Sequence, residues 1–76
     1  MAPGAATVSV PSLRYWRTRA ALRQLELAER AGVGIMSVHR GEAGLPLQLA
    51  TVRKLADALG VTPARLQARP PGEAGA

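Results

Sequence analysis

The sequence predicts an all-α fold of five short helices. Apolar residues recur three or four positions apart through most of the chain, which is the spacing of a buried helical face. Gly32 and Gly60 each follow such a segment, where a glycine can end a helix because it adopts φ > 0 without steric cost. With 76 residues and no cysteine, the chain is expected to form one small domain without disulfides.

The first predicted helix follows a segment with little helical character. Residues 1–11 are mostly small and contain two prolines, so we expect a flexible N-terminal segment. A short strand in TVSV or an arm that wraps DNA is the alternative, and the absence of Lys and Arg argues against the arm. Ser12 is the expected N-cap of a helix from residue 13 to about 20 or 21. The inner face of this helix is expected to carry Leu13, Trp16, Arg17 and Ala20.

Two further helices are predicted on either side of Gly32, at residues 24–31 and at residues 35 to 41 or 42. Ala28 is small enough to let the second helix cross closely over the first, and Gly32 permits a sharp turn between them. Val38 then faces back into the angle between the helices. This pattern is typical of a helix-turn-helix, whose second helix is presented outward to enter a DNA major groove.

The last two helices follow a leucine-rich connector at residues 43–49. A helix is predicted at 50–59, closed by a C-terminal glycine cap, and Thr62-Pro63 is a strong start signal for a short fifth helix. The expected division is a flexible segment at 1–11, a helix-turn-helix domain at 12–68 and a disordered tail at 69–76.

One set of residues follows the pattern of a known family. It comprises Gln24, Leu27-Ala28, Ala31-Gly32-Val33, Val38, Arg40, Glu42, Gly44 and Val52 to Val61. In these residues the chain resembles the Cro/lambda-repressor-like (Xre-type) DNA-binding family. The resemblance covers residues 13–66 and implies the compact five-helix lambda-repressor-like fold. It also implies a sequence-specific transcriptional regulator, typically a repressor, that binds double-stranded DNA as a homodimer on paired half-sites.

The resemblance also assigns roles to single residues. The outward face of the helix at about 35–41 would read bases, and Arg40 is equally compatible with a base contact and a phosphate contact. The residues assigned to base readout are Ile35, Met36, Ser37, His39 and Arg40. Ile35 and Met36 have no donors, so they would only touch thymine methyl groups or shape the fit. The residues assigned to phosphates are Arg23, Gln24, Arg19 and Arg53.

Two positions on the predicted third helix concern its packing. By resemblance, Arg17 and Glu42 form a partly buried salt bridge between the first and third helices. Gly41 stands where a larger apolar residue is usual in the family, so either its neighbours fill the space or the helix ends there. The stability is consequently expected to be modest, and Gly41→Leu is expected to raise it.

Composition and charge narrow the classes of function. The net charge of +5 favours an anionic partner, with nucleic acid first. Five carboxylates, one His and no Cys offer no nucleophile–base pair and no metal cluster, so we expect neither an enzyme nor a cofactor. The apolar runs are too short to span a membrane and residues 1–11 lack signal-peptide character, so the expected location is cytoplasmic.

A second hypothesis keeps the fold and changes the partner. In this reading the chain is an antitoxin or adaptor, and the connector from Leu45 to Leu49 binds a toxin or another regulatory protein. The two hypotheses are not exclusive, because an antitoxin of this type can also bind an operator.

Overall fold

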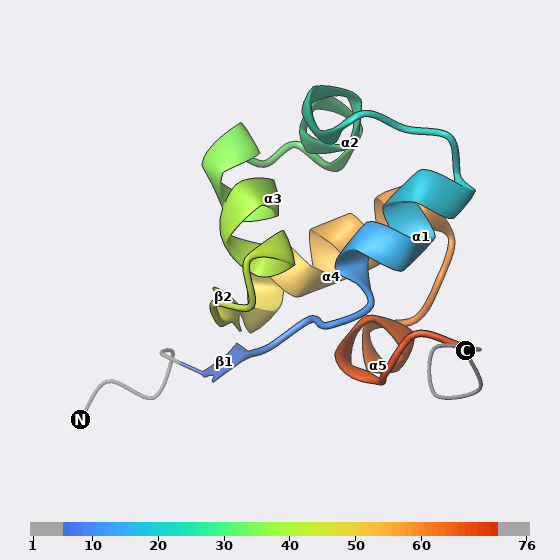
Figure 1. The fold of residues 1–76 in the computed structure, drawn as a ribbon. Helices are drawn as coiled ribbons and strands as arrows, with labels where there is room; N and C mark the ends of the chain where they lie inside the picture. Colours follow the sequence, from blue (N-terminus) through green and yellow to red (C-terminus); the bar gives the residue numbers. More distant parts are fainter. Residues whose placement is uncertain (1–5, 72–76) are drawn as a thin grey trace.

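The computed structural model describes residues 6–71, which form five helices and one small sheet (Figure 1). The helices are α1 (Leu13–Arg19), α2 (Gln24–Ala31), α3 (Ile35–Glu42), α4 (Leu49–Leu59) and α5 (Pro63–Gln67). The strands are β1 (Thr7–Val8) and β2 (Leu47–Gln48). The sequence therefore locates each helix to within one or two residues, whereas the all-α description omits the sheet.

The sheet corrects the expectation of a flexible segment at 1–11. β1 pairs with β2 in antiparallel fashion, with Thr7 opposite Gln48 and Val8 opposite Leu47. Val8 is half-buried and Val10 is 1% exposed, because alternate residues of an extended segment face the same side. Residues 6–11 are thus part of the fold, and residues 1–5 lie outside the described part of the chain.

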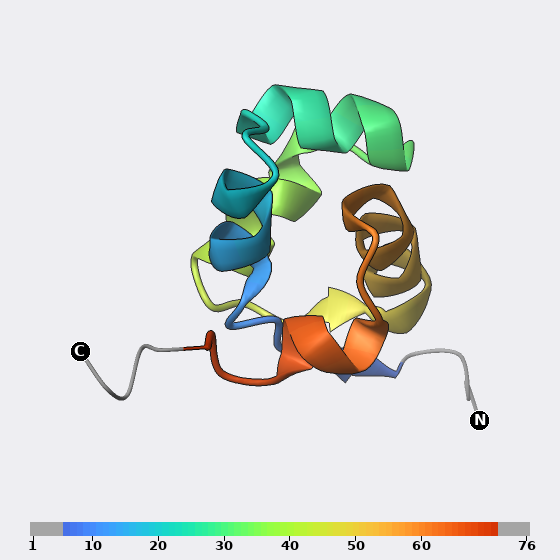
Figure 2. The same cartoon turned by 90° about the vertical axis from the view of Figure 1, so that its right-hand side faces the viewer.

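The helices surround one apolar core. In Figure 2, α2 and α5 lie at opposite ends of the molecule, and α1 and α4 face each other between them. Each helix contributes at least one buried side chain to this core, which keeps the short elements in place although none is long enough to be stable alone. The core consists of Val10, Leu13, Leu22, Leu27, Ala28, Val38, Leu47, Val52, Leu55, Ala56 and Leu66.

Left-handed backbone conformations produce the sharp turns between helices. Gly32 ends α2 with φ 71° and ψ 35°, and its amide donates to the Ala28 carbonyl. Ala21, between α1 and α2, has φ 59° although it is not a glycine. A side chain in this region costs roughly 1–2 kcal/mol, so the turn before α2 is strained.

Ser12 occupies the N-cap position of α1, as the sequence predicted, but its side chain has a different role. Its side chain makes no cap hydrogen bond; it is fully buried, and its hydroxyl donates to the carbonyl of Ala68. The Ser12 amide donates to the Leu66 carbonyl at 3.2 Å. Ser12 therefore ties the start of α1 to the end of α5. Ala20, expected on the inner face of α1, is exposed because α1 ends one residue earlier.

Gly41 occupies a filled part of the core, which overturns the expectation that a larger residue would stabilise it. A Cβ atom there would lie 2.8 Å from Leu13 Cδ2, 2.9 Å from Leu47 Cδ1 and 3.1 Å from Val10 Cγ2. The helix does not end at Gly41, since α3 continues to Glu42. The side chains of Val10 and Leu47 fill the space that a larger residue at position 41 would occupy, and the sequence did not predict this.

The connector leucines divide between core and surface. Leu47 is 6% exposed, Leu49 is half-buried against the core, and Leu45 is 49% exposed. The apolar docking surface expected at Leu45 to Leu49 is therefore reduced to Leu45.

Candidate nucleic-acid interface

The turn between α2 and α3 holds α3 at the surface of the domain. Ala28 on α2 is 2% exposed and Val38 on α3 is fully buried, so the two helices meet through these side chains. Gly34 then begins α3 with an extended backbone, φ −71° and ψ 150°. One side of α3 is packed as a result, and the other side faces outward.

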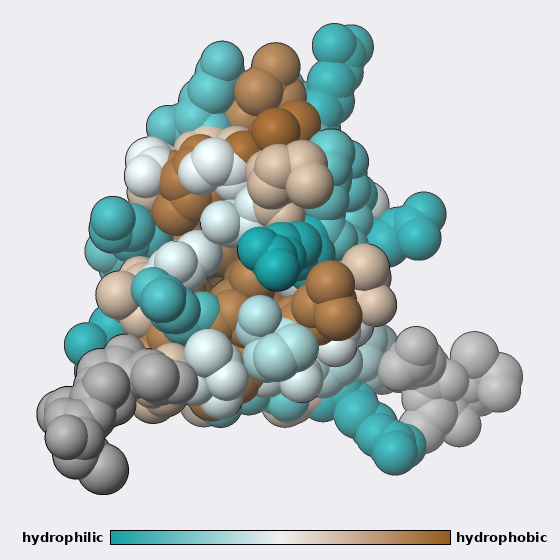
Figure 3. Space-filling view, turned by 90° about the vertical axis from the view of Figure 1, so that its left-hand side faces the viewer, coloured by the Kyte–Doolittle hydropathy of each residue, from teal (hydrophilic) through white to brown (hydrophobic). Residues whose placement is uncertain are grey.

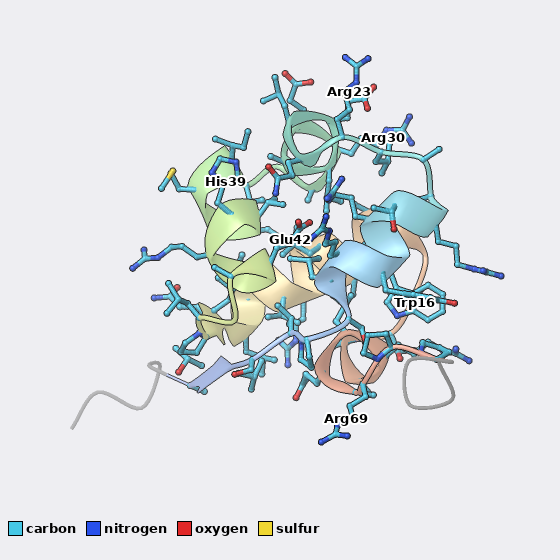
Figure 4. All side chains as sticks on the ribbon, viewed as in Figure 1. Trp16, Arg23, Arg30, His39, Glu42 and Arg69 are labelled. Atoms are coloured by element: carbon cyan, nitrogen blue, oxygen red, sulfur yellow. The ribbon has the colours of Figure 1, made fainter. Side chains whose placement is uncertain are left out.

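The outward side of α3 carries three exposed side chains. Met36 is 62% exposed, and His39 and Arg40 are also exposed. Ser37 is half-buried, and Ile35 packs against the core, which limits what Ile35 can contact. Figure 3 shows this side of the molecule, where hydrophilic side chains separate several apolar patches. In Figure 4, His39 points away from the body of the domain.

A polar network behind α3 joins three helices. Arg17 donates through Nε to Glu42 Oε2, through a terminal nitrogen to Glu42 Oε1 at 3.0 Å, and through the other to the Leu22 carbonyl at 2.9 Å. The bidentate geometry fixes the carboxylate in one orientation. The side chains of Arg17 and Glu42 are only 12% and 8% exposed. The hydrogen bond with Glu42 raises the pKa of Arg17 above its ordinary value, opposed by burial and reinforced by the Glu42 charge.

Gln24 belongs to the same network. Its Nε2 donates to Glu42 Oε1 at 3.0 Å, so the side chain of this phosphate candidate is directed toward Glu42. The second N–H group of the amide is the donor that could reach a phosphate. The Arg17 pair thus positions both α3 and the Gln24 side chain at the start of α2.

The start of α2 supplies a different kind of contact. Arg23 is exposed, and its backbone amide donates to Glu26 Oε1 at 2.8 Å. This bond is half of a capping box, because an Arg side chain has no acceptor with which to complete it. The guanidinium of Arg23 is therefore available for an anion near the positive end of α2.

The other two phosphate candidates lie on different parts of the domain. Arg53 is exposed on α4. Arg19 lines a hollow with Trp16 and residues 59–61 at the C-terminal end of α4, and its guanidinium carbon lies 5.9 Å from the Tyr15 ring centre. The N-terminal end of α4 adjoins β2 beside α3 (Figure 1), so Arg19 is not brought to the outward side of α3.

A comparison with known protein families covers most of this domain. A family model described as a helix-turn-helix domain matches residues 12–68, which is more than half of the chain. The chain belongs to this helix-turn-helix domain family. Searches of curated proteins and of solved structures found no match. A helix-turn-helix domain indicates a DNA-binding regulator, whereas the narrower Cro/lambda-repressor-like assignment stays a prediction.

Two other properties of the helix-turn-helix domain concern partners. Among residues 6–71, no group of three or more His, Cys, Asp and Glu side chains could hold a metal ion. The longest helix that the structure describes, α4, has 11 residues, and no helix of this part is long and apolar enough to cross a membrane.

The structure has a polar hollow beside α3 that the sequence did not predict. It has a volume of about 250 Å³ and lies where β1, α3, β2 and α4 meet. We call it the α3–α4 hollow; it is lined by Thr7, Ser37, Arg40, Pro46, Leu47, Gln48 and Thr51. Ser37 and Arg40 were assigned to base readout, but the other lining residues carried no motif. The pairing of β1 with β2 brings Thr7 to the hollow.

Proposed function

We propose that the chain is a sequence-specific regulator that binds double-stranded DNA by placing α3 in the major groove. The observation that carries the proposal is the exposed side of α3, held outward by a packed turn at Ala28, Gly32 and Val38. A helix is the element that fits the width of the major groove. Membership of the helix-turn-helix family supports the same partner.

Within this proposal the residues divide by the part of DNA that they contact. Met36 and His39 are exposed on α3 and would meet base edges, with the half-buried Ser37 beside them. Met36 would contact a thymine methyl group, and His39 would offer a hydrogen bond. Arg23 would contact a phosphate, together with the free amides at the start of α2.

We also propose that two copies bind paired half-sites and that the regulator represses by occupying its operator. Two copies of a helix-turn-helix bind half-sites about 34 Å apart, so the operator would be a palindrome. The alternative role as a protein-binding antitoxin or adaptor would depend on Leu45, the only exposed leucine of the connector.

Selection from a random pool of duplex DNA tests the function. The expected result is enrichment of a short palindrome, which the protein then binds more tightly than a scrambled duplex of equal length. Affinity should fall as salt rises, with a slope in log–log form of about 0.9 for each phosphate contacted. No enrichment above the starting pool, with equal affinity for selected and scrambled duplexes, would refute sequence-specific binding.

Two variants separate the roles of the side chains in this assay. His39→Ala should change the preference among bases at one position of the site by about 1–3 kcal/mol. Arg23→Ala should weaken the selected and scrambled duplexes equally and lower the salt slope by about 1. Arg69→Ala is the matched control for loss of charge, because Arg69 follows α5 at the end of the domain away from α3 (Figure 4).

A further inference from the structure

The α3–α4 hollow has the chemistry of an anion site. Of the side chains that line it, Thr7, Ser37, Arg40, Gln48 and Thr51 can each donate a hydrogen bond, and one is a permanent cation. No carboxylate lines it. The larger hollow of about 520 Å³ beside α1 differs in this respect, because Glu42 is part of its wall.

The polar side chains of the α3–α4 hollow are not used within the fold. In the described part of the chain, none of the five donates or accepts a side-chain hydrogen bond, and Arg40 has no ion pair. Ser37 and Thr51 are half-buried, as are Gln24 and Arg17, which bond to Glu42, whereas Thr7, Arg40 and Gln48 are exposed at the rim of the hollow. The hollow therefore presents unused donors that converge from four elements.

The position of the hollow determines which anion it would meet. Ser37 and Arg40 are one turn apart on α3 and lie on the same side of that helix. The first turn of α4 contributes Thr51 to the lining and contains no acidic residue, so the positive end of α4 lies at the hollow. A duplex that holds α3 in its major groove brings one of its two backbones to this flank of the helix.

We propose that the α3–α4 hollow binds one backbone phosphate of the DNA and that Arg40 contacts this phosphate rather than a base. The inference rests on the proposed function and decides between the two roles that the sequence left possible for Arg40. Arg40 supplies the charge, and Thr51, Gln48, Ser37 and Thr7 supply neutral donors around it. Such a contact fixes the register of α3 in the groove and adds no sequence preference of its own.

Thr7 has a particular place in this site. It lies in β1, before the residues 12–68 that the family model matches, and it reaches the hollow because β1 pairs with β2. The N-terminal strand would thus contribute to binding in this chain although it carries no charge.

Binding measurements on selected and scrambled duplexes over a salt series test the proposal. Arg40→Ala should lower the affinity for both duplexes by the same factor, roughly tenfold, and lower the salt slope by about 1. Thr51→Val, which keeps the shape of the side chain, should weaken both a few-fold and leave the slope unchanged. Arg69→Ala, the control away from α3, should change the affinity for either duplex only slightly, because the charge it removes lies far from α3. Circular dichroism of each variant checks that the helices are retained.

Replacement of single phosphates by neutral methylphosphonates identifies the contact. At one position in each half-site, the modified duplex should bind wild type and Arg40→Ala equally, while wild type stays tighter at all other positions. The proposal is overturned if Arg40→Ala changes the preferred base at one position with the salt slope intact, or if no phosphate position removes the effect of the substitution. A wild-type protein that binds no duplex would instead refute the proposed function, and this proposal with it.

Discussion

The substitution Gly41→Ala tests the packing behind α3. The added Cβ would lie closer than van der Waals contact to three side chains at once, from Leu13, Leu47 and Val10. Leu13, Val10 and Leu47 are 0%, 1% and 6% exposed, so none of them can move into solvent. The core therefore has to shift to accept even one methyl group.

The expected loss of stability is the difference between two effects. Overpacking a well-filled core costs about 1–3 kcal/mol. Replacing a helical glycine by alanine returns at most about 1 kcal/mol, and less here because Gly41 is next to the last residue of α3. We expect Gly41→Ala to lower the unfolding free energy by about 1 kcal/mol. For a domain of this size, that corresponds to a fall in Tm of about 4–8 °C. Gly41→Leu should lower the unfolding free energy further, because it adds more atoms to the same filled space.

Denaturant unfolding followed by circular dichroism and by Trp16 fluorescence measures the effect. Leu47→Val removes one of the clashing atoms, so its combination with Gly41→Ala should lose less stability than the sum of the two single changes. Leu66→Val is the matched control, because Leu66 is buried on α5 and is not among the atoms nearest to Gly41; its effect should be additive. A rise in Tm for Gly41→Ala would show that a cavity exists and that the packing described here is wrong.

Four other substitutions test local features. Arg17→Met should lower the unfolding free energy by about 3 kcal/mol, because it leaves the Glu42 carboxylate buried without its cation; an unchanged denaturation midpoint would show that the pair has no structural role. Ser12→Ala should cost about 1–2 kcal/mol by removing the hydroxyl that joins α1 to the Ala68 carbonyl, and hydrogen exchange should then increase first in α5; uniform exchange would argue against that link. Ala21→Gly and Gly32→Ala form a pair, because both residues have similar left-handed conformations. Calorimetry should show an unchanged or slightly higher Tm for Ala21→Gly, and a loss of about 1 kcal/mol of unfolding free energy for Gly32→Ala. The reverse order would contradict the left-handed conformation at these two positions.

Much of the fold could be predicted because its signals are local. The helical spacing of apolar residues, the glycines at 32 and 60 and the Thr62-Pro63 pair each act within a few positions, and the helices begin and end close to them. The Thr62 side chain does accept from the Arg65 amide at 3.2 Å. Local signals of this kind are sufficient to predict where short helices begin and end.

The parts that could not be predicted depend on residues far apart in the sequence. The strand at Thr7–Val8, which the sequence left only as an alternative, pairs with the distant residues 47–48. Val10 and Leu47 together fill the space at Gly41. The Ser12 hydroxyl was expected to bond locally as a cap, but its partner is the Ala68 carbonyl, 56 residues away, which no local signal indicates. The α3–α4 hollow combines residues from 7 to 51 for the same reason. The motif predicted which side of α3 is exposed, but not the hollow next to it.

Mapping the protein surface that contacts DNA tests the central claim most directly. Uniformly ¹⁵N-labelled protein would be titrated with the selected duplex while the backbone amide resonances are followed. The largest shifts are expected at residues 35–40, at Arg23 and Gln24, and at residues 47–51, with little change along α5. Shifts concentrated on α5 and the exposed side of α1, with α3 unaffected, would show that a different surface meets the DNA.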